Sequence, residues 1–268
     1  MDALPAIVMI TKKLKLLLIG ALWGVLSCQP DYGMSYEVVE EIQPTEVVVD
    51  SFMQPKPPEK LDVLIVVDTS CSMNDNFQQV SVGVELLRGD IEKLTLDYKI
   101  GFINSGLVIP YFAGPYDYTA DPIDFLLAPY LLGSDWYEQG FQSMYEFVTG
   151  TPEGGEFFRD DADKLIIFVS DENEQGAIPT NVFHDWLVEK FELVQHDVVA
   201  IVQLESGECP LNWEYDVGQK YIDLVAYYGK VGIDICSDWE AWLGDSTFLV
   251  GEIDYINLSQ TPLEDSII

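Results

Sequence analysis

The chain has 268 residues, of which 48% are apolar, enough to form the core of one domain of about 200 residues beyond a leader and a linker. Its 46 Asp and Glu residues oppose 13 Lys and Arg residues, giving a net charge of −33. Repulsion from a phosphate backbone therefore argues against a nucleic acid as partner. Most of these acids are expected on a solvated surface, so only carboxylates at special positions are candidates for function.

Residues 1–27 are predicted to be a signal peptide of the lipoprotein type. Three lysines precede an apolar run from Leu16 to Leu26, which is too short to span a bilayer comfortably. The tetrapeptide VLSC at 25–28 resembles a lipoprotein signal-peptidase box, and this resemblance implies lipidation of Cys28. The expected location is the bacterial cell envelope, with the lipid anchor as the only membrane contact. Without lipidation of Cys28 the protein would be secreted.

Residues 28–60 are predicted to be an acidic, proline-containing tether, since they end in QPKPPEK, a composition that disfavours helix. Within the tether, EVVVDSF at 46–52 could add an edge strand. The folded domain is expected at 61–250. Residues 251–268 would be a C-terminal extension with no evident terminal cap, which a further module could follow.

Short apolar runs alternate with amphipathic segments through the domain, as in α/β proteins with a mainly parallel sheet. LDVLIVV at 61–67 is typical of a central strand buried on both faces. Further strands are predicted at 98–104, 108–113, 164–170, 197–203 and 232–236. Apolar residues at steps of three and four predict helices within 77–94, 137–148, 183–194 and 217–228. This order predicts a doubly wound, mainly parallel central sheet flanked by helices.

Three oxygen-bearing side chains, Asp68, Ser70 and Ser72, lie two residues apart directly after the 61–67 strand. A loop at that position lies at the carboxyl edge of the sheet, where open α/β folds bind their ligands. Side chains on alternate positions of a tight loop can converge on one cation. Oxygen ligands suit Mg²⁺, with Mn²⁺ or Ca²⁺ as alternatives.

LDVLIVVDTSCSM at 61–73 resembles the first strand and the D-x-S-x-S metal-ion-dependent adhesion site of von Willebrand factor A domains, and the resemblance covers about residues 60–250. It implies that Asp68 acts largely through bound water, while Ser70 and Ser72 ligate the ion directly. It also implies a Thr from a second loop and an Asp from a third. Asp171, which follows the KLIIFVS strand at 164–170, matches the third-loop aspartate.

The second loop departs from the family pattern, because GSDWYEQGF at 133–141 contains no threonine. Ser134 is the expected substitute, with the carboxylate of Glu138 as the alternative. A carboxylate there would make the ion less attractive to an external acid. Glu172 and Glu174 are expected to form a solvated acidic turn, although they could also tune the third loop or bind another ion.

Three cysteines remain beyond Cys28. An exported protein permits disulfides, and Cys209 with Cys236 is the expected pair because both lie late in the chain, outside the proposed metal loop. Cys71 is then left over, and its place at the end of a buried strand predicts a small shielded thiol.

The resemblance implies binding without bond making or breaking: a bound ion accepts an Asp or Glu carboxylate from a protein partner at a cell or virion surface. VVVDSFMQP at 47–55 and IDICSDW at 233–239 resemble flanks of such proteins in marine bacteria and their phages. One alternative is a structural envelope or virion scaffold in which the ion stabilises the loops.

An enzyme is the remote alternative. A Mg²⁺-dependent phosphatase of the haloacid dehalogenase type would need a second Asp where Ser70 stands. The only histidines, His184 and His196, have no metal-ligand spacing. The protein is therefore expected not to be an enzyme.

Overall fold

The computed structural model describes residues 6–7, 51–52, 57–106, 109–205 and 216–243. The chain divides into two units, one of Met1–Pro55 with Ile253–Ile268 and one of Lys56–Glu252. In the first unit, strands β1 (Ala6–Ile7) and β2 (Ser51–Phe52) pair antiparallel. The described end of the expected 46–52 strand thus belongs to this two-stranded sheet and not to the central one. Most of the predicted leader, tether and extension lies outside the described residues.

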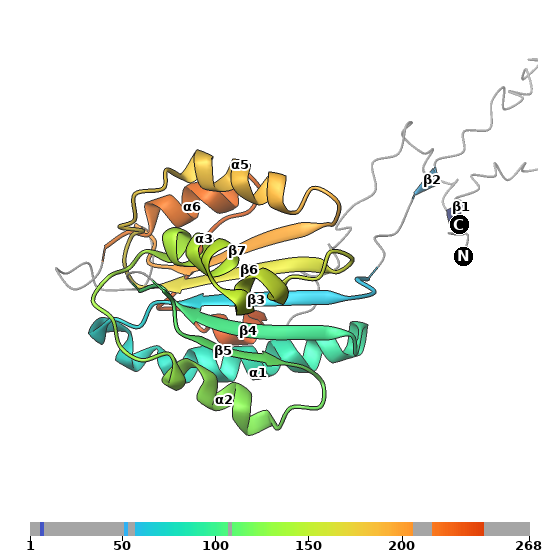
Figure 1. Cartoon of the computed structure of the whole chain (residues 1–268), viewed down its shortest axis with the longest axis horizontal. Helices are drawn as coiled ribbons and strands as arrows, with labels where there is room; N and C mark the ends of the chain where they lie inside the picture. The colour runs from blue at the N-terminus through green and yellow to red at the C-terminus, as the bar shows by residue number, and fades with distance from the viewer. Residues whose placement is uncertain (1–5, 8–50, 53–56, 107–108, 206–215, 244–268) are drawn as a thin grey trace, which may run out of the picture. The chain divides into compact units, whose positions relative to one another are not determined.

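The second unit is built on a six-stranded sheet (Figure 1). Every neighbouring pair is parallel except β4 with β5, which is antiparallel. The predicted doubly wound, mainly parallel sheet is confirmed. In spatial order the strands are β5 (Phe112–Tyr116), β4 (Tyr98–Asn104), β3 (Leu61–Val67), β6 (Asp163–Ser170), β7 (His196–Val202) and β8 (Ile233–Asp234).

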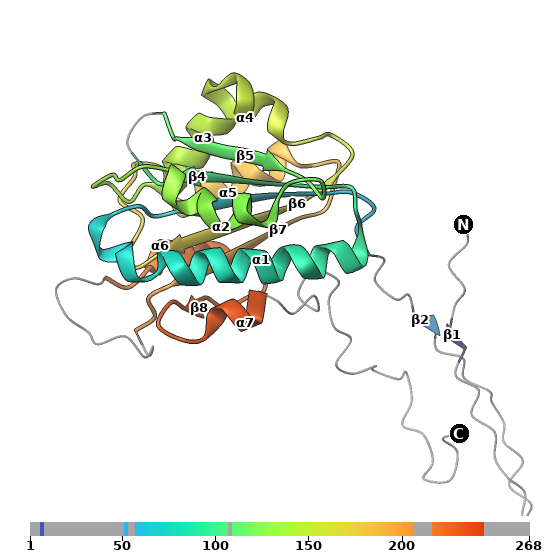
Figure 2. The ribbon, with the colours of Figure 1, turned by 90° about the horizontal axis from the view of Figure 1, so that it is seen from below.

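Helices cover both faces of this sheet, as Figures 1 and 2 show. Successive strand residues point to opposite faces, so Val63 and Ile65 pack with one helical layer while Leu64 and Val66 pack with the other. Both layers therefore bury apolar surface against the same central strand. The first layer comprises α1 (Phe77–Leu94), α2 (Pro122–Leu131) and α7 (Trp239–Leu243); the second comprises α3 (Gly140–Gly150), α4 (Pro152–Phe157), α5 (Thr180–Lys190) and α6 (Gln219–Ala226).

The structure departs from the sequence prediction at the sheet edge. The strand expected at 108–113 is β5 at 112–116, and it runs antiparallel because it returns directly beside β4. Helices α2, α4 and α7 were not predicted. Within the described residues, no helix is long and apolar enough to cross a membrane.

The strand register explains where the site lies. Val67 pairs with Asn104 of β4 and with Val169 of β6, so three neighbouring strands end almost level. The chain runs from β3 to β4 and β5 on one side and then crosses to β6 on the other side of β3. The topological switch point therefore lies between β3 and β6, where open α/β sheets bind ligands.

Candidate metal centre

Asp68 is fixed by hydrogen bonds at the end of β3. Its backbone N–H donates to the Val169 carbonyl at 2.8 Å, which continues the pairing of β3 with β6. One carboxylate oxygen, Oδ1, accepts the Ser70 N–H at 2.8 Å, and Oδ2 accepts the Ser170 hydroxyl at 2.7 Å. The side chain is buried, so these donors orient both of its oxygens.

A chain of side-chain contacts joins the first loop to the third. The hydroxyl oxygens of Ser70 and Ser72 lie 2.8 Å apart. Ser72 also donates to Asp171 Oδ1 at 3.3 Å. Ser72 belongs to the short 3₁₀ turn η1 (Cys71–Asp75), which turns its side chain towards the third loop. The structure thus brings together Ser70, Ser72 and Asp171 beside Asp68.

The carboxylate of Asp171 has unused acceptor capacity. The residue is 0% exposed, and its Oδ2 accepts no hydrogen bond from any described residue. Leaving a buried polar atom without a partner costs about 1–3 kcal/mol, so such atoms point to a missing ligand. In the part of the chain that the structure describes, eight buried side-chain atoms are of this kind, and five of them follow the carboxyl ends of strands, on Thr69, Ser105, Asp171 and Gln203.

This donor set fits a hard divalent cation with its water molecules, because every candidate ligand atom is an oxygen. No three His, Cys, Asp or Glu side chains of the described segments gather into a metal-binding group by themselves. The candidate ligand set therefore depends on the serine hydroxyls as well as on Asp68 and Asp171.

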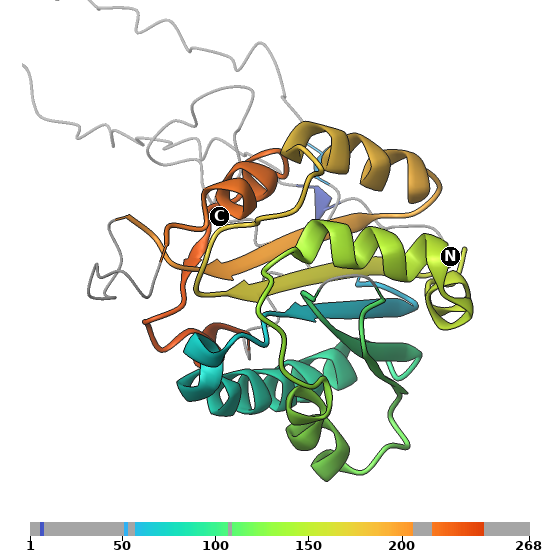
Figure 3. The ribbon, with the colours of Figure 1, turned by 60° about the vertical axis from the view of Figure 1, so that its left-hand side comes forward.

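Backbone hydrogen bonds hold the second loop, between α2 and α3, against the other two. The Asp135 N–H donates to the Thr69 carbonyl at 3.3 Å, and the Gln139 N–H donates to Ser105 O at 2.8 Å. Gln175 of the third loop donates its N–H to Glu138 O at 2.7 Å. In Figure 3 this loop passes the end of β3 on its way to α3.

The two second-loop candidates have different environments. Glu138 is 3% exposed, and its carboxylate accepts a hydrogen bond from the Gln175 side chain. Ser134 is exposed, and no contact joins its hydroxyl to the other candidate ligands in the part of the chain that the structure describes. The structure thus places Glu138, the less expected alternative, beside the predicted site.

Crowding of carboxylates changes the proton affinity of the site. Burial and the charges of Asp68, Glu172 and Asp171 raise the pKa of Glu138 to about 8. Burial and the charges of Asp68 and Glu172 raise the pKa of Asp171 to about 7, although the Ser72 hydrogen bond opposes this. A cation would relieve this repulsion, since it favours the ionised form of every carboxyl around it.

The third loop differs from the expected solvated turn. Glu174 is buried, and its carboxylate accepts the N–H groups of Phe141 and Gly176, both at 2.8 Å. The Tyr221 hydroxyl also donates to it, at 3.1 Å. Glu174 therefore ties the third loop to the first turn of α3 and to α6. Glu172 keeps a partly exposed position near the site.

Sequence reasoning missed Ser170 and did not predict that Glu174 is a buried positioning residue. Ser170 is the last residue of β6, and its polar character at the end of an apolar strand is a signal that it faces the loops. Glu174 gives no comparable signal, because two of its three partners, Phe141 and Tyr221, lie 33 and 47 positions away.

The cysteines follow the prediction only in part. Cys71 is free and exposed, so the expectation of a shielded thiol is wrong: it begins η1, whose turn directs Ser72, and not Cys71, towards the third loop. Cys236 is disulfide-bonded. Cys209 and Cys28 lie outside the described residues, so the Cys209–Cys236 pair and the lipidation of Cys28 stay predictions.

Solved structures of proximal thread matrix protein 1 from the mussel byssus are similar to this chain. One crystal form aligns with a TM-score of 0.52 and 14% identity, over 73% of this chain and 48% of that chain. The fold is von Willebrand factor A-like. A structure of the same mussel protein with a zinc-occupied MIDAS motif, a metal-ion-dependent adhesion site, aligns with a TM-score of 0.51 and 12% identity over 70% and 46%.

A third structure of the mussel protein gives a TM-score of 0.50 and 14% identity over 73% of this chain and 47% of that one. This chain thus spans about half the length of these neighbours. No protein-family model and no curated protein matches the sequence. At these identities the similarity establishes the fold alone.

Proposed function

We propose that the domain is a divalent-cation-dependent protein-binding module, in which a bound ion accepts a partner's carboxylate. The observation that carries this proposal is the chain of contacts from Ser70 through Ser72 to the buried Asp171, whose second carboxylate oxygen accepts no hydrogen bond from the described residues. It lies at the switch point of the sheet, where a ligand can approach from outside the strand ends.

Ser70, Ser72 and Asp171 would hold the ion, with Asp68 acting through water. The oxygen-only donor set favours Mg²⁺, with Mn²⁺ or Ca²⁺ as alternatives, because zinc prefers nitrogen and sulfur ligands. The zinc-occupied motif of the mussel protein makes a divalent ion in such a site physically reasonable. When bound, the ion would supply a Lewis-acidic coordination position for a carboxylate oxygen of the partner.

The chain's own residues would set how strongly that position attracts a partner. Ser170 and the Ser70 N–H hold Asp68 in one orientation, which pre-organises the first loop. Glu138 adds negative charge on the second-loop side. If Glu138 also ligates the ion, the ion attracts an external carboxylate less strongly than it would beside a threonine or serine hydroxyl.

The proposed location remains that predicted from the sequence: an exported protein held at the bacterial envelope through Cys28. A lipid on Cys28, followed by the 28–60 tether, would leave the domain free to meet partners outside the membrane. Metabolic labelling with a radioactive fatty acid tests this part, because a Cys28→Ser variant should lose the label.

Partner capture with the full chain tests the proposed function. We expect the full chain to release its captured partner in EDTA and to bind it again when Mg²⁺ is added. The Asp68→Ala variant should capture no partner. Circular dichroism must show that the variant is folded. The matched control is Asp185→Asn, which removes a well-exposed carboxylate on α5 and should leave capture unchanged.

A second candidate function is a structural scaffold in which the ion only stabilises the loops. The observation that favours it is that the structural neighbours are thread matrix proteins, together with the burial of Asp171. Capture retained by folded Asp68→Ala and in EDTA would support the scaffold and contradict binding through the ion.

A further inference from the structure

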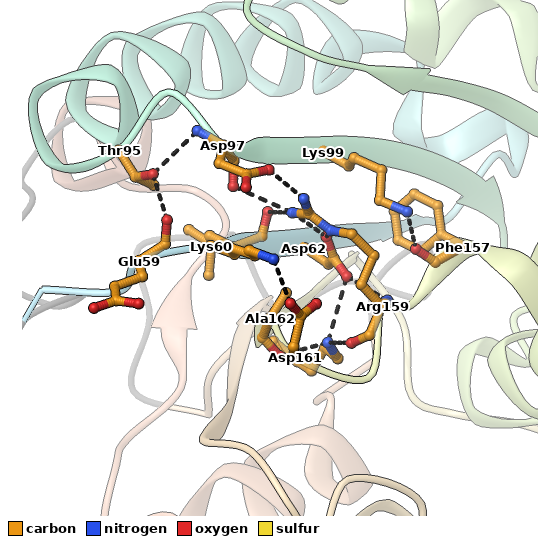
Figure 4. A network of polar contacts seen from close by, with 12 residues as sticks. Glu59, Lys60, Asp62, Thr95, Asp97, Lys99, Phe157, Arg159, Asp161 and Ala162 are labelled. Carbon is orange, nitrogen blue, oxygen red and sulfur yellow. Dashed lines mark hydrogen bonds and ion pairs between the residues drawn. The ribbon is translucent and has the colours of Figure 1, made fainter.

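Positive charge in the described domain is concentrated at the amino edge of the sheet, opposite the candidate metal centre. Figure 4 shows part of this edge, where Arg159 bonds to Asp62 and Asp97 and where Lys60 bonds to Asp161. Eight of the nine described Lys and Arg residues lie on this side: Lys60, Arg88, Lys93, Lys99, Arg159, Lys164, Lys190 and Lys230.

These cations mostly neutralise acids of their own edge. Ion pairs join Arg88 to Glu85 and Glu92, and Lys230 to Asp197. Lys164 pairs with Asp62 at 3.3 Å. Most cations of the amino edge are therefore engaged by acids of the same edge.

Within the described segments, the carboxyl edge has almost no compensating cation. Lys220 is the only described basic residue there, and its amino group donates to the Gly176 carbonyl at 3.1 Å. A single divalent ion would offset only two of the negative charges gathered around it. The acids of this edge include Asp68, Glu138, Asp171, Glu172, Glu174 and Asp216.

Exposed aromatic side chains border this acidic edge on the second-loop side. We call Tyr111, Tyr130, Trp136 and Tyr137 the aromatic rim; Trp136 is 80% exposed, and the other three are exposed as well. Trp136 and Tyr137 lie in the same loop as Glu138. Large exposed aromatic side chains next to a candidate site are typical of a contact surface.

The other two rim residues are anchored close to that loop. The Tyr111 N–H donates to Asn104 Oδ1 at 2.8 Å, at the carboxyl end of β4, and a Cβ on Gly133 would lie 3.5 Å from its ring. Tyr130 packs edge-on against Phe77, which begins α1 shortly after the η1 turn, with ring centroids 5.7 Å apart.

We propose that the partner of this face is a basic protein surface, whose Lys or Arg side chains pack on the aromatic rim around the one carboxylate that reaches the ion. This proposal rests on the proposed function and specifies its partner. Guanidinium and ammonium groups bind the faces of Trp and Tyr rings, and a negative edge attracts them over long range. An acidic partner, including a second copy of this chain, would be repelled.

Binding of three fluorescent synthetic peptides to the full chain in Mg²⁺ tests the proposal by anisotropy. One peptide has a single Asp flanked by Arg and Lys, the second has Asn in place of that Asp, and the third has the Asp flanked by Ser. We expect the basic Asp peptide to bind at least about tenfold more tightly than the Ser-flanked one at low salt, with the gap closing as salt screens the charges.

Two variants test whether the aromatic rim itself contributes to peptide binding. Trp136→Ala should weaken the basic Asp peptide about threefold to tenfold, the worth of a cation–π contact. Tyr118→Ala is the matched control: Tyr118 is also exposed, but it follows β5 at the amino edge of the sheet, and its loss should change nothing.

The outcomes distinguish this proposal from the proposed function. If the Ser-flanked Asp peptide binds as tightly as the basic one at every salt concentration, the basic partner is wrong and binding through the ion stands. If the basic Asn peptide binds as tightly as the basic Asp peptide, with and without Mg²⁺, the prediction of a basic partner is supported. The proposal that the ion binds a partner carboxylate is then wrong. Binding of no peptide, or equal binding to the Trp136→Ala variant, would overturn the proposal.

Discussion

The Ser72 hydroxyl donates a hydrogen bond to Asp171 Oδ1 at 3.3 Å and so joins two loops whose residues are 99 positions apart in sequence. The contact exists because β3 and β6 are parallel neighbours that end at the same level. The first and third loops are therefore positioned by the sheet itself, and they can form a binding site without a large rearrangement.

Replacing Asp171 by Asn should abolish stabilisation by Mg²⁺. The amide has nearly the same shape and can still accept the Ser72 hydrogen bond, but it lacks the negative charge that a cation requires. Thermal denaturation of the wild type should show a higher midpoint with Mg²⁺ than with EDTA, and the variant should show no difference. Asp185→Asn is the control, and it should respond to Mg²⁺ like the wild type. An unchanged response of Asp171→Asn would contradict its role as a ligand.

Replacing Glu138 by Gln should weaken Mg²⁺ binding about tenfold, because this buried carboxyl lies beside Asp68 and Asp171. Ser134→Ala should leave the affinity unchanged, since the Ser134 side chain is exposed. Isothermal titration calorimetry of both variants measures the effect. The reverse result would show that Ser134 is the second-loop ligand.

The metal-free protein should become less stable as the pH rises from 6.5 to 8. Asp171, with a pKa near 7, and Glu138, with a pKa near 8, keep protons in the folded state that the unfolded chain has already lost. Deprotonation then favours unfolding in this window. Urea denaturation in EDTA measures the trend, and Glu138→Gln should flatten it. If the free energy of unfolding in EDTA instead increases with pH, the pKa values of these two carboxyls are not raised in the folded state.

Replacing Asp62 by Ala at the amino edge should cost about 3–5 kcal/mol of unfolding free energy, because it leaves a buried charge unpaired. Asp62 is 0% exposed and accepts hydrogen bonds from Arg159 and Lys164, and the Lys164 side chain is itself buried. Urea denaturation measures the loss, and adding Lys164→Met should recover part of it. The Mg²⁺ affinity should not change, since this network lies at the edge of the sheet opposite Asp68, Ser70 and Ser72. A folded variant with lowered Mg²⁺ affinity would show that the two edges are coupled.

The central strands were predictable because parallel strands buried on both faces are continuous apolar runs. The bounds of β3 and β4 were predicted to the residue. Helix α2 was missed although Asp121 caps it, by accepting the Ile123 N–H at 3.0 Å, and Pro122 begins it. That signal was available, but the apolar run after Pro122 has no clear helical period.

The candidate site was predictable where a candidate ligand directly follows a strand. Asp68 and Asp171 satisfy this condition, because strand ends fix their positions relative to each other. Glu138 does not, because its place depends on how the second loop crosses the sheet edge. Hydrogen bonds from Gln139 to Ser105 and from Gln175 to Glu138 determine that crossing, and both join residues far apart in sequence.

A crystal structure of the domain grown with Mn²⁺ tests the metal centre most directly, because anomalous scattering locates the ion independently of the protein atoms. We predict an anomalous peak beside Ser70 Oγ, Ser72 Oγ and the Asp171 carboxylate, with manganese–oxygen distances of about 2.0–2.6 Å, the range of hard divalent ions. Well-ordered loops without a peak at this position, at a Mn²⁺ concentration that saturates stabilisation, would contradict the assignment of the site.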